Sequence, residues 1–336
     1  MSGLTMRRAL LVAALSGAVL VAAIARPLPA GAHPDHEYGV AAPSAPGAPA
    51  GRDVPRNWHE LARAWEFDPG VVLPLLLSGA LYLGGVWGGR GLRRGVRRRE
   101  VACFAGGWLT LVIALVSPLH PWGEALFSAH MTQHELLMLV AAPLLVLGSP
   151  LAPTLRALPR SWTHALARAS RAGAWTRIVQ TLRNPVIAWA VHGTVLWAWH
   201  APALFDAAVE NETVHALQHL SFLGSAVLFW WALLHGRGRA MAYGAAVLYL
   251  FTTAMYSGLL GALLTFSESP WYPAYAATAR YWGVSAVEDQ QLGGLIMWVP
   301  ACSLYLVVAL ALFARWMRVS SAGARRSEER AAVGEP

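Results

Sequence analysis

The sequence contains no lysine, and all 26 of its basic side chains are arginines. Charged residues make up only 13% of the 336 residues, whereas about 25% is usual for a soluble domain. Cysteine is also scarce, because Cys103 and Cys302 are the only two. These scarcities exclude lysine-based catalysis, a disulfide framework and an ordinary soluble domain.

Hydrophobic residues, by contrast, make up 56% of the chain, which predicts a membrane protein. The formal net charge of +8 could suit nucleic acid. However, the arginines gather between long apolar runs, so we expect anionic membrane lipids rather than nucleic acid as their partner. No nucleophile–base pair, phosphate-binding loop or nucleotide motif is present, so we expect no enzymatic activity.

The N-terminus has the pattern of a secretory targeting segment. Two arginines precede an apolar run over residues 9–24, and Ala30-Gly31-Ala32 fits a small-x-small cleavage site. We predict a cleavable signal peptide over residues 1–32, followed by an external linker and pre-membrane segment over 33–70. An uncleaved first span is the alternative, although its apolar run is short for about 20 residues of membrane helix.

Seven long apolar segments follow, and each approaches or exceeds the length that a helix needs to cross a membrane. They are residues 71–89, 101–117, 126–148, 185–202, 214–235, 241–265 and 291–317. We therefore predict an all-α polytopic membrane protein. Its seven transmembrane helices form one domain over residues 71–317, and a cytoplasmic tail covers 318–336.

The segments between these runs alternate in charge. One set is rich in arginine and consists of RGLRRGVRRRE, residues 149–184, the segment with Arg237 and Arg239, and the tail. The other set contains PLHPWGE, APALFDAAVENE and a segment with Glu268, Glu288 and Asp289. By the positive-inside rule the arginine-rich set is cytoplasmic, so the N-terminus lies outside and the C-terminus inside.

Two pairs of histidines begin predicted helices at the outer face. His130 and His134 open the third segment in HMTQHE, and His215 and His219 open the fifth in VHALQHL. Histidines four positions apart lie on one face of a helix, which is a two-ligand metal spacing. Alternatively, the pairs only mark the points where two helices leave the membrane, where histidine is tolerated.

Further candidates lie at the same face. His200 closes the fourth segment, Asp289 precedes the seventh, and His120 occupies the short outer loop PLHPWGE. His192 lies near the middle of its segment, where we expect a buried, hydrogen-bonded side chain. The candidate metal ligands are therefore His130, His134, His200, His215, His219 and Asp289, with His120 and His192 as further candidates.

Three blocks carry a resemblance to a known family: HMTQHELLMLVAAPLLVLGSP, WAWHAPALFDAAVENETVHALQHLSFL and DQQLGGLIMWVP. They resemble the multi-pass, seven-span CtaG family of cytochrome c oxidase assembly factors over roughly residues 71–316. The resemblance implies a plasma-membrane protein that matures the oxidase by helping copper reach one of its subunits. It places the family's outer-face histidines on His130, His134, His200, His215 and His219. It places the family's acidic element on Asp289 and Gln290. This chain departs from the family at Glu135, where an apolar residue is usual.

Three other functions stay open at this stage. The histidines could bind haem in a b-type cytochrome or membrane oxidoreductase, although such ligands usually lie on facing helices within the hydrocarbon layer. A metal permease would need polar groups along a route to the cytoplasm, and few lie below His192. A scaffold could hold oxidase subunits without binding copper.

Overall fold

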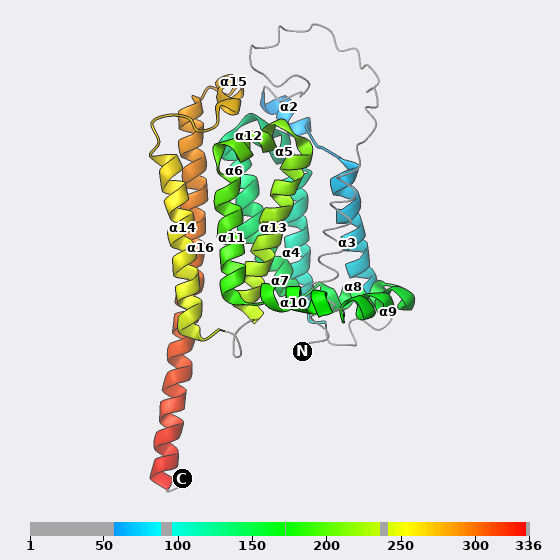
Figure 1. Cartoon of the computed structure of the whole chain (residues 1–336), viewed down its shortest axis with the longest axis vertical. Helices are drawn as coiled ribbons and strands as arrows, with labels where there is room; N and C mark the ends of the chain where they lie inside the picture. Colours follow the sequence, from blue (N-terminus) through cyan, green and yellow to red (C-terminus); the bar gives the residue numbers. More distant parts are fainter. Residues whose placement is uncertain (1–56, 89–95, 172, 236–240, 334–336) are drawn as a thin grey trace.

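The computed structural model describes residues 57–88, 96–171, 173–235 and 241–333, and each regular element in these ranges is a helix (Figure 1). The predicted all-α class is therefore confirmed. The predicted signal peptide over residues 1–32 and most of the predicted linker lie outside the described residues.

Each predicted apolar segment coincides with a helical stretch. These stretches are α3 (Pro69–Trp87), α4 (Arg98–Leu115), the continuous run of α6 (Phe127–Glu135), η2 (Leu136–Ala141) and α7 (Ala142–Gly148), α11 (Pro185–Trp199), α13 (Glu212–His235), α14 (Tyr243–Thr265) and α16 (Ala286–Val333). Within the described ranges, five stretches are long and apolar enough to cross a membrane. A sixth is added if α4 and α5 (Leu119–Ala125), which meet at 43°, form one bent span. At 15 residues α11 is shorter than a straight span requires, so the count of seven stays a prediction.

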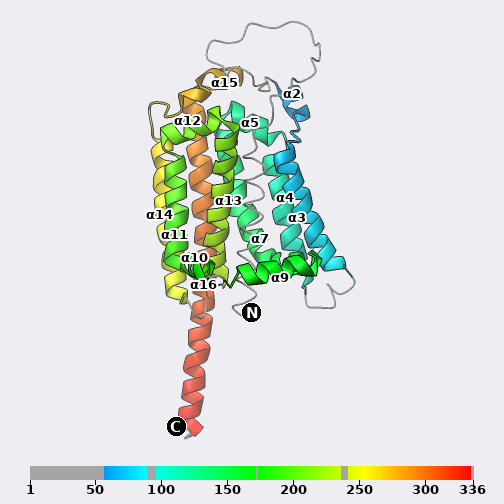
Figure 2. The ribbon, with the colours of Figure 1, turned by 45° about the vertical axis from the view of Figure 1, so that its right-hand side comes forward.

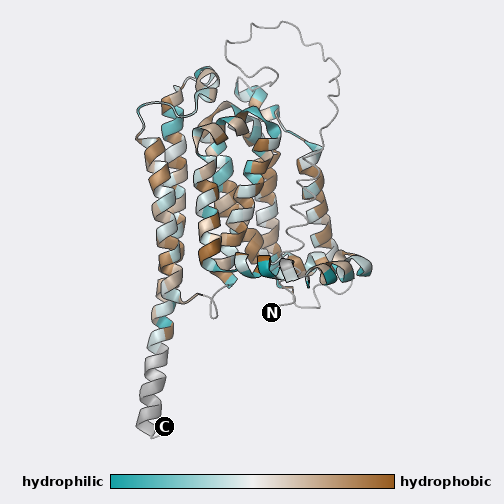
Figure 3. Ribbon diagram, viewed as in Figure 1, coloured by the Kyte–Doolittle hydropathy of each residue, from teal (hydrophilic) through white to brown (hydrophobic). Residues whose placement is uncertain are grey.

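Short helices cover the two ends of the bundle (Figures 1 and 2). One end holds α2 (Trp58–Arg63), α5, α12 (Pro202–Glu210), η3 (Pro273–Tyr275) and α15 (Ala276–Tyr281), and we call it the histidine end. Across the opposite end lie α8 (Leu151–Ala157), α9 (Arg160–Ala169) and α10 (Gly173–Leu182), and we call it the arginine end. Figure 3 shows hydrophobic residues predominating along the bundle between these ends. The separation of charge along the chain thus becomes a separation in space.

Helix α16 is longer than the sequence pattern predicted. It runs without interruption to Val333, past the predicted start of the tail at residue 318, and extends beyond the arginine end (Figure 1). The segment that follows residue 318 is rich in alanine, arginine and glutamate, which are strong helix formers. Helix propensity therefore continues the span where hydropathy alone would end it.

Close approach between α14 and α16 depends on two glycines. A Cβ atom added to Gly294 would lie 2.8 Å from the carbonyl oxygen of Gly261, and one added to Gly261 would lie 3.0 Å from that of Gly294. Small residues at such contacts let membrane helices approach to backbone contact. Helix α16 also packs along α6, so this contact helps to cover the helix that carries the first histidine pair.

Candidate metal centre

Side-chain capping fixes where α13 begins. The Asn211 side chain accepts hydrogen bonds from the backbone amides of Thr213 (2.9 Å) and Val214 (3.1 Å). Asparagine at this position satisfies amides that the helix itself leaves without partners. His215 follows in the first turn and His219 in the next, so the cap sets the depth of both imidazoles.

Helix α6 takes its cap from another helix. The Asp289 carboxylate of α16 accepts hydrogen bonds from the backbone amides of Phe127 (2.6 Å) and Ser128 (3.1 Å) and from the Ser128 hydroxyl (2.5 Å). The negative charge also complements the positive end of the helix dipole. The structure therefore places the predicted ligand Asp289 at the start of α6 and not with the imidazoles. Its visible role is to hold the helix that carries His130.

A π-helical segment, η2, begins two residues after His134. Such segments are rare and occur frequently at functional sites. The indole Nε1 of Trp230 donates to the carbonyl of Met138 inside it (2.9 Å), which ties η2 to α13. Glu135, the departure from the family pattern, lies within electrostatic reach of Cys302 and Tyr305 on α16.

The two histidine pairs face each other across α6 and α13, as the sequence predicted. Ring centroids lie 4.4 Å apart for His130 and His134, 4.3 Å for His215 and His219, and 5.0 Å for His130 and His215. The ring of His134 also lies 5.3 Å from that of His219 and 6.4 Å from that of His200. Five predicted ligands from α6, α13 and the end of α11 therefore form one group, which we call the imidazole cluster.

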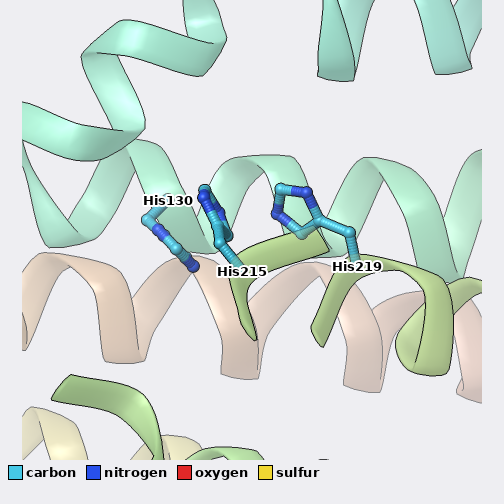
Figure 4. A group of neighbouring side chains, drawn as sticks. All are labelled: His130, His215 and His219. Carbon is cyan, nitrogen blue, oxygen red and sulfur yellow. The ribbon is translucent and has the colours of Figure 1, made fainter. Parts of the chain in front are cut away.

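Three members of the cluster have the geometry of a metal site. Figure 4 shows the rings of His130, His215 and His219 side by side, and one nitrogen of each lies within 4.8 Å of the others. Ligand nitrogens around an ion with bonds of about 2.0 Å are about 3.3 Å apart. A shift of the rings by roughly 1 Å would therefore close them around an ion.

Burial leaves several ring nitrogens of the cluster without partners. The five histidines are between 1% and 8% exposed. Both ring nitrogens of His134 and the Nε2 atoms of His200 and His219 are buried without a hydrogen-bond partner. An unsatisfied buried polar group costs about 1–3 kcal/mol, so this arrangement is unfavourable unless something binds there. A metal ion that accepts one lone pair from each ring would satisfy part of this deficit.

Hydrogen bonds already orient two of the rings for ligation. Nδ1 of His200 donates to the carbonyl of Leu196 (2.7 Å), which leaves Nε2 as the lone-pair nitrogen. The Tyr275 hydroxyl donates to the carbonyl of Gly123 (3.1 Å), so its oxygen can accept from Nδ1 of His130, also 3.1 Å away. Partners of this kind fix the tautomer of metal-binding histidines. The amide of Gln218 lies 3.3 Å from Nε2 of His130 and is the group that an ion there would displace.

Aromatic side chains form the wall of the cluster. The ring of Phe205 lies 5.1 Å from that of His130, and the ring of Phe222 lies 4.5 Å from that of His134. Tyr272 closes the loop side by donating to the carbonyl of His200 (2.8 Å). Burial raises the pKa of Tyr272, so its hydroxyl stays protonated and keeps this bond. Aromatic rings therefore cover part of the cluster.

The two further candidates have different positions. His120 lies on α5, and its ring stacks on that of His215 with centroids 5.3 Å apart. His192 lies deeper in α11, where Nδ1 is 3.3 Å from the Ser225 hydroxyl and the ring packs on Phe229. The first borders the imidazole cluster, whereas the second is the buried, hydrogen-bonded residue that its position in the sequence predicted.

Sequence reasoning missed two residues at the cluster, Tyr275 and Glu124. Tyr275 lies 145 residues from His130 in the sequence, so no local pattern connects them. Glu124 follows His120 by four positions in LHPWGEA, the same spacing as in the two histidine pairs. That spacing was the available signal, and it was missed because the segment was interpreted as a loop.

Comparisons with known proteins point to one family. A family model described as "Cytochrome c oxidase caa3 assembly factor" matches residues 80–319. An uncharacterized protein of Mycobacterium tuberculosis is 30% identical over 234 residues, which are 67% of this chain and 35% of the relative. One of Mycobacterium leprae is 28% identical over 294 residues, which are 82% of this chain and 43% of the relative. The chain thus spans less than half the length of these relatives. No solved structure matches it.

Proposed function

The chain belongs to the family of cytochrome c oxidase caa3 assembly factors, and from this premise we propose that it binds Cu(I) at the imidazole cluster and passes it to an oxidase subunit. Copper is the cargo in this proposal. The ion would be held first by His130, His215 and His219, because one nitrogen of each lies within 4.8 Å of the others.

The observation that carries the proposal is the burial of five imidazoles, several with unpartnered nitrogens, at one end of a membrane bundle. Neutral imidazole suits copper, whereas calcium and magnesium require oxygen ligands. Asp289 is engaged by α6, and the three-ligand group of His130, His215 and His219 contains only imidazoles. The site is therefore suited to an ion of low charge, such as Cu(I).

The neighbouring nitrogens suggest how an ion leaves. His134 and His200 offer unpartnered nitrogens beside the three-ligand group, so the ion can exchange one ligand for another without entering the hydrocarbon layer. No step in this transfer makes or breaks a covalent bond of the protein. We accordingly propose a binding and handover role without catalysis.

The proposed orientation follows the charge of the two ends. The arginine end faces the cytoplasm and its anionic lipids, and the histidine end faces outward in the plasma membrane. An oxidase subunit in the same membrane would then receive copper from the outer surface. Short helices α5, α12 and α15 cover that surface, and such a subunit would dock on them.

The proposal is tested in cells that lack the gene and carry either the wild-type chain or His130→Ala+His219→Ala. We expect the double variant to insert in the membrane and to leave oxidase subunits present but deficient in copper. His164→Ala, at the arginine end, is the matched control and should behave as wild type. Normal copper content with the double variant would support a metal-free scaffold, and a strong Soret band in the purified protein would support haem binding; either result contradicts the proposal.

A further inference from the structure

A second group of metal-binding side chains borders the imidazole cluster. Helix α5 carries His120 and Glu124 on one face, one turn apart. A ring nitrogen of His120, a carboxylate oxygen of Glu124 and a nitrogen of His215 all lie within 4.8 Å of one another. His215 also belongs to the three-ligand group with His130 and His219. The two groups therefore share one imidazole.

The environment of this second group differs from that of the imidazole cluster. The His120 side chain is 20% exposed, and the carboxylate of Glu66 lies 3.3 Å from its Nε2. His130, in contrast, is 1% exposed and surrounded by imidazole and aromatic rings. Two carboxylates next to an accessible imidazole favour an ion of higher charge than a buried all-histidine set does.

We propose that His120, Glu124 and His215 form an outer site for a divalent transition-metal ion, and that the shared His215 links its occupancy to that of the imidazole cluster. The mixed nitrogen and oxygen ligands are those that divalent ions of the later first transition series accept. Glu66 stands at the edge of the site, where its carboxylate adds negative charge. The outer site is inferred from its geometry alone. Only the coupling of its occupancy to that of the imidazole cluster rests on the proposed Cu(I) function.

Glu66 and Gln133 contact the two ring nitrogens of His120, so an ion at the outer site would displace one of them. The amide nitrogen of Gln133 donates to the carbonyl of Ala114 (2.7 Å) and lies 3.0 Å from Nδ1 of His120. Gln133 comes from α6, so the helix that carries the first histidine pair also orients the ring on α5. A Cβ atom added to Gly123 would lie 2.5 Å from Oε1 of Gln133. A larger residue at this position would therefore force the Gln133 side chain to move.

The test uses the full chain purified in detergent, with Co²⁺ as the divalent probe followed by its visible absorption, and Cu(I) titrated separately under anaerobic conditions. His120→Gln and Glu124→Gln should each weaken Co²⁺ binding by about tenfold or more and leave Cu(I) stoichiometry unchanged. His130→Gln should have the opposite pattern, and His215→Gln should weaken both. Glu268→Gln is the matched control for Glu124→Gln, because Glu268 is an exposed glutamate.

Two results would overturn the inference: full Co²⁺ affinity in Glu124→Gln, or equal loss of Co²⁺ and Cu(I) in His120→Gln, which would mean one merged site. A wild-type protein that binds Co²⁺ as predicted but binds no Cu(I) would contradict the proposed function and leave the outer site intact. Thermal unfolding of each variant excludes misfolding as the cause of a loss.

Discussion

Two helical stretches that are long and apolar enough to cross a membrane differ in what surrounds them. In the apolar part of Phe127–Gly148, 61% of the residues are buried within the protein, whereas in that of Pro69–Trp87 only 22% are, although their mean hydropathies of 1.4 and 1.7 are similar. The buried stretch carries two histidines, a glutamine and a glutamate. The peripheral stretch, α3, presents leucines such as Leu73 and Leu76 outward.

The difference has a physical cause. Lipid offers no hydrogen-bond partners, so polar side chains within a membrane are tolerated where neighbouring helices cover them. Gln133 illustrates this, because α4 supplies a carbonyl acceptor for its amide. Hydropathy along the sequence is thus a poor guide to where a site lies, and coverage by other helices is a better one.

The largest expected effect comes from separating α16 from the helices that it covers. In Gly294→Leu, the added side chain would meet Thr265 Oγ1 at 2.6 Å and the Gly261 carbonyl at 2.8 Å. We expect a loss of about 3 kcal/mol or more in folding free energy. Gly224→Leu is the matched control, since nothing lies within 4 Å of its added Cβ. Thermal unfolding in detergent measures both, and equal midpoints would show that the contact between α14 and α16 is not tight.

A smaller effect is expected from removing the cap of α6. Asp289→Asn replaces an acceptor by an amide group that cannot accept at both sites, which should cost about 1–3 kcal/mol. It should also loosen the start of the buried stretch near His130 and weaken Cu(I) binding. Glu268→Gln, an exposed neutralisation of the same charge, should change neither property. Calorimetry and Cu(I) titration of the two variants decide the matter; unchanged Cu(I) affinity in Asp289→Asn would separate the cap from the site.

Tyr275→Phe tests whether the Tyr275 hydroxyl orients the imidazole of His130. Loss of the hydroxyl removes the partner of His130 Nδ1, and outer-shell partners of this kind are worth about tenfold or more in metal affinity. We expect Cu(I) affinity to fall by about that factor while the unfolding midpoint changes little. Tyr281→Phe, at a tyrosine that is 50% exposed, provides the control. An unchanged affinity in Tyr275→Phe would remove Tyr275 from the site.

The smallest expected effect is a pH dependence at the surface of the histidine end. Partial burial, with a smaller contribution from Glu210, raises the pKa of Asp206 on α12. The folded state therefore holds this proton more tightly than the unfolded state, and stability declines as the pH rises through the carboxyl range. Asp206→Asn should flatten the stability profile in that range and leave the profile above it parallel to wild type. An identical slope in both proteins would contradict this.

Much of this arrangement could be predicted from the sequence, because helical periodicity and loop charge are local. The four-residue spacing put each histidine pair on one face, and alternation of arginine-rich loops put both pairs at one end. The contacts that could not be predicted join segments that are distant in the sequence. Asp289 caps α6 across 162 residues, and Tyr275 reaches His130 across 145; neither contact leaves a local pattern.

Helix ends were the other source of error. The bend between α4 and α5 turns PLHPWGE from an expected loop into a helix, so Glu124 joins His120 on one face. Helix α16 likewise extends past the apolar run, because helix propensity continues it. Both differences arise where hydropathy changes and local backbone preferences decide the structure.

Cu(I) stoichiometry of the purified chain tests the central claim most directly, since it measures whether the buried imidazoles form a site. One tightly bound Cu(I) per chain is predicted for wild type and for His164→Ala, and its loss is predicted for His130→Ala+His219→Ala. Wild-type protein that binds no Cu(I), or a double variant that retains full stoichiometry, would contradict the claim.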